Sequence, residues 1–118
     1  MPSRTSRGRE GESRAAAALE AGGMEILARN FRSRSGEIDI IAREKDTLVF
    51  VEVKTWDHYG LEDLRLGINE KKQRRIIETA KYFLQEHRKY NEMGIRFDVV
   101  FISPQGIDHL ASAFTERV

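Results

Sequence analysis

The chain has no cysteine, only two prolines, and no apolar run long enough to cross a membrane. Without cysteine, disulfide bridges and thiolate zinc sites are excluded. The longest apolar stretch, Thr47–Val51, has the length of a strand and falls far short of a membrane span. The first ten residues contain no apolar segment that a signal peptide could use. We therefore expect a cytoplasmic protein with no membrane partner.

An excess of charge of one sign is also lacking, because 20 basic residues nearly balance 19 acidic ones. The positive charge is nevertheless clustered. The clusters are Arg4, Arg7 and Arg9; Arg29, Arg32 and Arg34; and Lys71, Lys72, Arg74 and Arg75. Three such clusters suit the backbone of a nucleic acid, whose phosphates supply most non-specific affinity. Any one cluster alone is better explained as a solvated face.

At 118 residues the chain has room for one domain, which we place at residues 1–118. Periodicity and turn residues predict a helix at 9–21, strands at 24–32, 36–42 and 47–55, a helix capped by Asn69 and reaching about residue 88, a strand at 96–103 and an optional strand at 107–114. The order αβββαβ(β) predicts an α/β fold. A three-strand meander, a crossover helix and a returning strand imply a mixed sheet flanked by helices.

The predicted strands at 36–42 and 47–55 carry acids among apolar residues. Alternation along the second of these strands places its valines on one face and places Glu52 and Lys54 at the end of the other face. Along the first strand, the same rule puts Ile38 and Ile40 on one face and Asp39 on the opposite face. Both strands therefore bring a carboxylate into a sheet that is otherwise apolar.

The register between these two strands decides whether the acids meet. A two-residue hairpin loop at Lys45-Asp46 would set Asp39 opposite Glu52, and Glu37 opposite Lys54. Facing carboxylates destabilise a sheet unless they are neutralised, and Mg²⁺ prefers carboxylate and water oxygens. A three-residue loop without a bulge would instead send Asp39 and Glu52 to opposite faces.

Glu12 adds a further acid from the first helix. At about 100° per residue, it lies on the same side of the helix as Ala16 and Leu19, which is the side expected to face the sheet. An acid in that position is unfavourable unless it is paired or solvated in a cleft. Each acid alone is better explained as an exposed or salt-bridged carboxylate. Together with the lysine that follows Glu52, they favour a metal site.

These residues resemble the PD-(D/E)XK superfamily, which includes restriction endonucleases and archaeal Holliday-junction resolvases. Glu52-Val53-Lys54 matches the E-x-K part of the motif, and Asp39 matches the leading acid. More closely, the chain resembles the YraN family of small uncharacterised bacterial proteins (uncharacterised protein family 0102). The matching stretches run in family order: Gly8–Glu12, Asn30–Arg32, Gly36–Ile41, Val49–Thr55, Lys72–Arg75 and Arg96–Val99.

The resemblance implies a restriction-endonuclease-like fold, and it implies ligand roles for Glu12, Asp39 and Glu52 toward Mg²⁺ or Mn²⁺. In this interpretation the carbonyl of Val53 completes the metal shell. Lys54 orients the attacking water or stabilises the developing negative charge. The implied activity is that of a Mg²⁺-dependent phosphodiesterase, an endonuclease or a resolvase-like enzyme, with DNA as the expected substrate.

Four basic residues are expected to contact the phosphate backbone of the nucleic acid, namely Arg32, Lys72, Arg74 and Arg75. Where the family usually has arginine after Lys54-Thr55, this chain has Trp56, which either stacks on a base or packs beside the loop. The three histidines, His58, His87 and His109, form no metal-spaced set, and we interpret them as structural.

Two alternatives to a nuclease stay open on the sequence. One is a nucleic-acid-binding module of nuclease fold without efficient catalysis, and the other is a protein-interaction domain whose acids pair with arginines. Binding alone needs no buried carboxylates, so the complete set of acids and lysine argues against the first alternative. The sequence does not choose between DNA and RNA, or between a monomer and a homodimer, although nucleases of this kind often pair to cut two strands.

Overall fold

The computed structural model describes residues 4–55 and 68–115, with side chains from Glu10 onward. Two residues of the sequence analysis, Trp56 and His58, lie outside the described residues, and so do the side chains of the first basic cluster, Arg4, Arg7 and Arg9. The predictions made for these residues therefore stay predictions.

The described chain has two long helices and five strands. In chain order these are α1 (Arg4–Ala21), β1 (Glu25–Ser33), β2 (Gly36–Glu44), β3 (Thr47–Thr55), α3 (Glu70–Glu86), a short 3-10 helix η1 (Arg88–Tyr90), β4 (Gly94–Ser103) and β5 (Gly106–Phe114). The predicted α/β order is confirmed, and the optional fifth strand is present. The short helix η1 was not predicted, and β4 begins at Gly94, two residues before the predicted start at Arg96.

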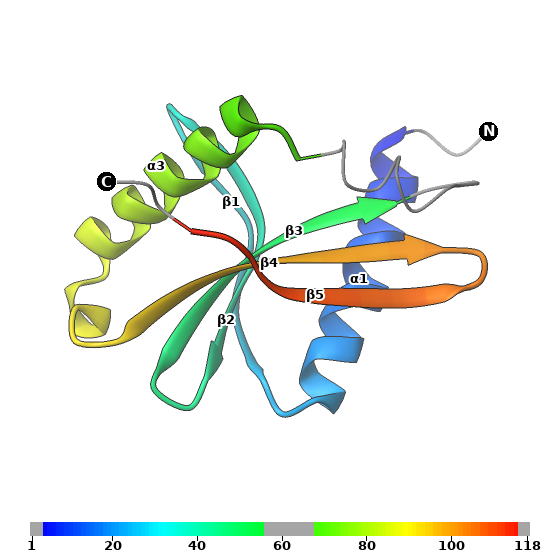
Figure 1. Ribbon diagram of the computed structural model, residues 1–118, viewed down its shortest axis with the longest axis horizontal. Helices are drawn as coiled ribbons and strands as arrows, with labels where there is room; N and C mark the ends of the chain where they lie inside the picture. Colours follow the sequence, from blue (N-terminus) through cyan, green and yellow to red (C-terminus); the bar gives the residue numbers. More distant parts are fainter. Residues whose placement is uncertain (1–3, 56–67, 116–118) are drawn as a thin grey trace.

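All five strands form one mixed sheet in the order β1-β2-β3-β4-β5. Every neighbouring pair is antiparallel except β3 and β4, which are parallel. Parallel neighbours need a crossover connection, and α3 lies within that connection. Figure 1 shows α1 and α3 on opposite sides of the twisted sheet. This arrangement is consistent with the restriction-endonuclease-like fold that the resemblance implied. Among the described helices, none has the length and apolar character needed to cross a membrane.

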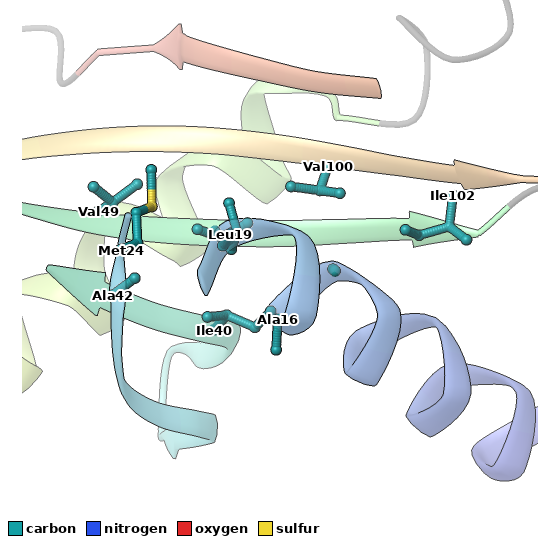
Figure 2. Packing of buried hydrophobic residues seen from close by; sticks show 10 residues of the cluster. Ala16, Leu19, Met24, Ile40, Ala42, Val49, Val100 and Ile102 are labelled. Atoms are coloured by element: carbon teal, nitrogen blue, oxygen red, sulfur yellow. The ribbon is translucent and has the colours of Figure 1, made fainter. Parts of the chain in front are cut away.

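Each face of the sheet has its own hydrophobic core. On one face, Ala16 and Leu19 of α1 pack on β2, β3 and β4, as Figure 2 shows for Ile40, Val49 and Val100. On the other face, α3 packs against β2 and β3 through a cluster that contains Ile38, Ile41, Leu48, Phe50, Ile76, Ile77, Ala80, Phe83 and Phe97. Full burial of one such large side chain contributes about 1.5–3 kcal/mol. The two cores fix both helices relative to the sheet.

Helix α3 begins as the sequence predicted. The side chain of Asn69 accepts a hydrogen bond from the backbone N–H of Lys72 at 2.9 Å, which satisfies one of the free donors of the first turn. The helix ends at Glu86, where the N–H of His87 donates to the carbonyl of Phe83. Capping at Asn69 matters for the site because it fixes where the first turn of α3 faces the sheet.

The hairpin register between β2 and β3 is the predicted one. Glu44 pairs with Thr47 across a two-residue loop, and the described ladder continues to the pair of Ile40 and Val51. The ladder stops there, one residue before Asp39 and Glu52. The predicted pairing of Glu37 with Lys54 therefore does not form within this ladder.

The predicted alternation along β2 is wrong at Asp39. Ile40 belongs to the α1 core, whereas Ile38 belongs to the α3 core, so the two isoleucines do not share a face. The interruption lies opposite Asn30 of β1, which adopts a left-handed backbone conformation with φ 54°. A left-handed residue interrupts the two-residue alternation of its own strand, and here the interruption of β2 lies directly across from the one in β1. On the N-terminal side of Asp39, the side chains of β2 therefore lie on the opposite face of the sheet from the one that strict alternation predicts.

Candidate functional site

Asp39 lies where the ladder between β2 and β3 has ended, and its side chain contacts β3 in place of the backbone. Its Oδ2 accepts a hydrogen bond from the backbone N–H of Val53 at 2.8 Å. This bond joins Asp39 to the E-x-K segment of β3, because Val53 lies between Glu52 and Lys54. The leading acid and the second half of the predicted motif are therefore in direct contact.

Three carboxylates gather at this end of the sheet. Glu12 of α1, Glu37 of β2 and Asp39 of β2 each place a carboxylate oxygen within 4.8 Å of the others. The interruption of alternation at Asp39 explains why Glu37 can reach an acid of α1, which strict alternation would not allow. From the sequence, Glu37 was expected only to lie opposite Lys54.

Close approach of α1 to the end of β3 depends on Gly11. A Cβ atom at this position would lie 2.5 Å from Oγ1 of Thr55, a separation that atoms do not tolerate. The absence of a side chain at Gly11 therefore lets the helix bring the next residue, Glu12, to the carboxylates of β2.

Glu12 is incompletely satisfied in this position. Its Oε1 atom is buried and has no hydrogen-bond partner among the described residues. A guanidinium nitrogen of Arg29 lies 3.9 Å from this atom, but it donates a hydrogen bond to Oγ of Ser13 at 3.1 Å. A buried carboxylate oxygen without a donor is unfavourable, and native proteins usually satisfy such atoms. Three carboxylate donors around this atom fit a hard divalent cation.

Glu52 faces the other side of the sheet, toward α3. Its side chain is 9% exposed, and its Oε1 forms an ion pair with Nζ of Lys72 at 2.8 Å. Glu52 also interacts with Asp39, because its negative charge, and a hydrogen bond that the protonated carboxyl group of Asp39 can donate to it, raise the pKa of Asp39. Four predicted site residues thus lie near one end of β3, namely Glu12, Asp39, Glu52 and Lys54. Lys72 forms an ion pair with one of them, Glu52.

The pKa of Asp39 reports the crowding of negative charge. Burial and then the charge of Glu52 raise the pKa of Asp39 to about 8, with a smaller contribution from Glu12. The hydrogen bond from Val53 acts in the opposite direction and does not compensate. The described cations therefore leave this carboxyl group short of positive charge.

The two lysines near Glu52 have opposite pKa shifts. Burial, followed by a hydrogen bond with Lys72 and the charge of Lys72, lowers the pKa of Lys54 below its usual range. Burial also acts to lower the pKa of Lys72, but hydrogen bonds with Glu52 and Lys54 outweigh it and raise this pKa. Lys72 is thus the firmly charged member of the pair, and Lys54 is the one that more readily gives up a proton.

A cavity of about 460 Å³ opens between the acids and the first turns of α3. One side is formed by the carboxylates Glu37, Asp39 and Glu52, and the other by Lys71, Lys72 and Arg75. An anionic group that entered this cavity would meet cations from α3 at one wall and the acid cluster at the other. This arrangement of a basic and an acidic wall suits a phosphate group whose negative charge is stabilised by the cations of α3 and by a metal ion at the acids.

The remaining predicted phosphate contacts are dispersed. Arg75 lines the cavity, whereas Arg74 is exposed and borders a different hollow of the surface. Arg32 is 76% exposed and pairs with Glu37 at 3.3 Å. Of the four predicted residues, Lys72 and Arg75 therefore face the cavity, and Arg32 approaches it only through Glu37.

A second group of charged residues lies around Asp98 of β4, which is fully buried. Asp98 accepts hydrogen bonds from Nε and Nη2 of Arg96, both at 2.9 Å, and from the N–H of Ser112 at 3.0 Å. Its Oδ2 lies 2.6 Å from Nε2 of His109, and Arg96 also pairs with Glu44 at 3.1 Å. Although burial acts to raise it, these donors lower the pKa of Asp98.

The described histidines have structural partners. His109 belongs to the network of Asp98, and His87 stacks on Phe83 with ring centroids 4.2 Å apart. Neither belongs to the carboxylate cluster. The sequence analysis did not identify the Asp98 network, although Arg96 and Asp98, two residues apart on one strand, share a face.

Comparison with known proteins identifies relatives over most of the chain. Residues 11–102 match the family described as "Uncharacterised protein family UPF0102". A UPF0102 protein of Treponema denticola is 50% identical, with 91% of this chain and 93% of that protein covered. A UPF0102 protein of Bradyrhizobium sp. (strain BTAi1) is 43% identical, with coverage of 91% and 78%. One from Persephonella marina is also 43% identical, with 92% of each chain covered. The chain belongs to the uncharacterised protein family UPF0102.

Proposed function

We propose that this protein is a divalent-metal-dependent phosphodiesterase that acts on nucleic acid, with DNA cleavage of the endonuclease or resolvase type as the expected reaction. The observation that carries the proposal is the acid cluster. Glu12, Glu37 and Asp39 bring carboxylate oxygens within 4.8 Å of one another, and a buried oxygen of Glu12 has no hydrogen-bond partner among the described residues. Such a donor set is incomplete without a cation.

Asp39 and Glu12 would hold the ion, with Glu37 within reach and Glu52 beside Asp39. Mg²⁺ or Mn²⁺, when bound, lowers the pKa of a coordinated water and stabilises charge on the scissile phosphate. The hydrogen bond from Val53 orients the carboxylate of Asp39, so that this ligand is already in place before the ion arrives.

Lys54 lies on the same strand face as Glu52 and interacts with both Asp39 and Glu52 through its charge. Because burial and Lys72 lower the pKa of Lys54, its ammonium group gives up a proton more readily than that of an ordinary lysine. In the proposed reaction this amine orients the attacking water or stabilises negative charge near the phosphate. Lys71 and Arg75, on the opposite wall of the cavity, would bind the phosphate backbone.

A second function rests on the same residues. Glu52, a predicted metal ligand, is paired with Lys72, as expected for a nucleic-acid-binding module of this fold without efficient catalysis. Both functions use the basic wall of the cavity, but only the nuclease needs Lys54. Substitution at Lys54 therefore separates them.

The test is a cleavage assay with Mg²⁺ or Mn²⁺ over DNA and RNA duplexes, single strands and branched structures. Lys54→Met keeps most of the apolar stem and removes the amine, so cleavage should fall by about two orders of magnitude. Lys45→Met is the matched control, because Lys45 is exposed in the turn at the far end of the same hairpin. This control should cut at the wild-type rate.

Two outcomes would contradict the nuclease proposal in different ways. If Lys54→Met cuts as fast as the wild type, the role given to Lys54 is wrong. If the wild type binds nucleic acid but cuts no substrate with either metal, the protein is the binding module instead.

A further inference from the structure

Lys72 occupies a position that phosphate binding does not explain. Its Nζ lies 2.8 Å from Oε1 of Glu52, so it is directed at the predicted ligand and not only at the open cavity. Asn69 caps the helix on the backbone N–H of Lys72, which fixes the origin of this side chain in the first turn of α3. The fold therefore delivers an ammonium group to the one acid of the motif that lies on the α3 face.

An ammonium group and a divalent cation cannot both lie close to the same carboxylate oxygen without strong repulsion. Glu52 is 7% exposed, so water screens its surroundings poorly. The divalent ion can use the oxygen of Glu52 fully only after Lys72 has withdrawn. The side chain of Lys72 is 36% exposed at the rim of the cavity, which gives its amine room to turn toward solvent or a phosphate.

We infer that Lys72 is a positioning residue that competes with the divalent cation for Glu52 and withdraws when the ion binds. The inference rests on the proposed function, because it presupposes that Glu52 takes part in metal binding. It assigns Lys72 a role that Arg74 and Arg75, the neighbouring basic residues, do not share. Neither of them forms a described ion pair with Glu52.

A purely structural ion pair would behave differently when broken. Removal of either partner would weaken the fold or the site, and would not improve binding of a cation. A competitor, in contrast, masks part of the affinity for the ion, and its removal reveals that affinity. The direction of the change in metal affinity therefore distinguishes the two roles.

The experiment is a calorimetric titration of the full chain with Mn²⁺ alone, without nucleic acid, at one pH and one ionic strength. Lys72→Met should bind Mn²⁺ at least about fivefold more tightly than the wild type, the ratio expected when a competing ion pair is removed. Lys71→Met removes the same charge from the same cavity wall but has no described contact with Glu52. Its Mn²⁺ affinity should change by less than about twofold.

A second variant protects the test against a failure to fold. Lys72→Gln keeps a hydrogen-bond donor for Glu52 without the charge, and it should also bind Mn²⁺ more tightly than the wild type. Equal or weaker affinity in both Lys72 variants, with Mn²⁺ bound by the wild type, overturns the inference and leaves the proposed metal site standing. Absence of Mn²⁺ binding in every variant overturns the proposed metal site itself, and the inference with it.

Discussion

Asp39 and Asp98 are acids of the same sheet, yet the protein surrounds them in opposite ways. Asp98 on β4 receives hydrogen bonds from the Arg96 guanidinium and the Ser112 N–H, contacts His109, and has a lowered pKa. Asp39 on β2 has one backbone donor and acidic neighbours, and its pKa is raised to about 8.

The surroundings of Asp98 show that this fold can supply hydrogen-bond donors and a cation to a buried acid with a structural role. Around Asp98, every described partner is a hydrogen-bond donor or can act as one. Asp39, in contrast, accepts a described hydrogen bond from the N–H of Val53, and the charged groups that raise its pKa are other carboxylates, which an internal structural role would not require. We infer that the partner of Asp39 is a cation that comes from solution.

The largest expected effect is at Asp98. Asp98→Asn removes the charge that holds Arg96 and leaves that guanidinium without its main partner. The free energy of unfolding should fall by about 3 kcal/mol, as is typical when one member of a buried ion pair is removed. Urea denaturation of the variant and the wild type measures this change. A loss below about 1 kcal/mol would mean that the Asp98 network contributes little to the fold.

In metal-free buffer at neutral pH, Asp39→Asn should change the free energy of unfolding in the direction opposite to Asp98→Asn. The asparagine can still accept the hydrogen bond from Val53, and it removes a carboxylate that its acidic neighbours destabilise. We expect the free energy of unfolding to rise by about 1 kcal/mol. The same urea experiment, carried out with a chelator, checks the sign. A loss of stability as large as that at Asp98 would remove the distinction between the two acids.

The pH dependence of stability should separate the same two residues. Since the pKa of Asp39 rises from 3.8 to about 8 on folding, the native state binds more protons than the unfolded state between these values. Stability without metal should therefore fall as the pH rises from about 4 to about 8. For Asp98 the pKa is lowered, so its contribution is present above pH 3.8 and is lost as the pH falls below that value.

Urea denaturation of the wild type and Asp39→Asn across this pH range measures the contribution of Asp39. The difference in stability between the two proteins should grow from pH 4 toward pH 8, because only the wild type carries the titrating group. A difference that does not vary with pH would show that Asp39 titrates normally in the folded protein.

Much of the fold followed from local sequence signals. The turn at Lys45-Asp46 fixed the hairpin register, the alternation of β3 placed Glu52 and Lys54 on one face, and Asn69 marked the start of α3. These features depend on neighbouring residues, so one sequence is sufficient to predict them.

The features that the sequence did not reveal depend on contacts between distant segments. The left-handed conformation of Asn30 has no clear sequence signal, although asparagine tolerates it. Opposite Asn30 lies the interruption of β2 with which Glu37 approaches the acid of α1. The ion pair of Lys72 with Glu52 depends on how α3 is placed over β3. The meeting of Asp98 with His109 depends on the register of β4 and β5.

The most direct test of the central claim is a crystal of the protein grown with Mn²⁺, with anomalous scattering measured at the manganese edge. We expect an anomalous peak among the carboxylates of Glu12, Glu37 and Asp39, on the side of Asp39 that Glu52 can reach, with Nζ of Lys72 moved away from Glu52. No peak at these residues under saturating Mn²⁺, with Lys72 still paired to Glu52, would contradict the claim that the acid cluster is a metal site.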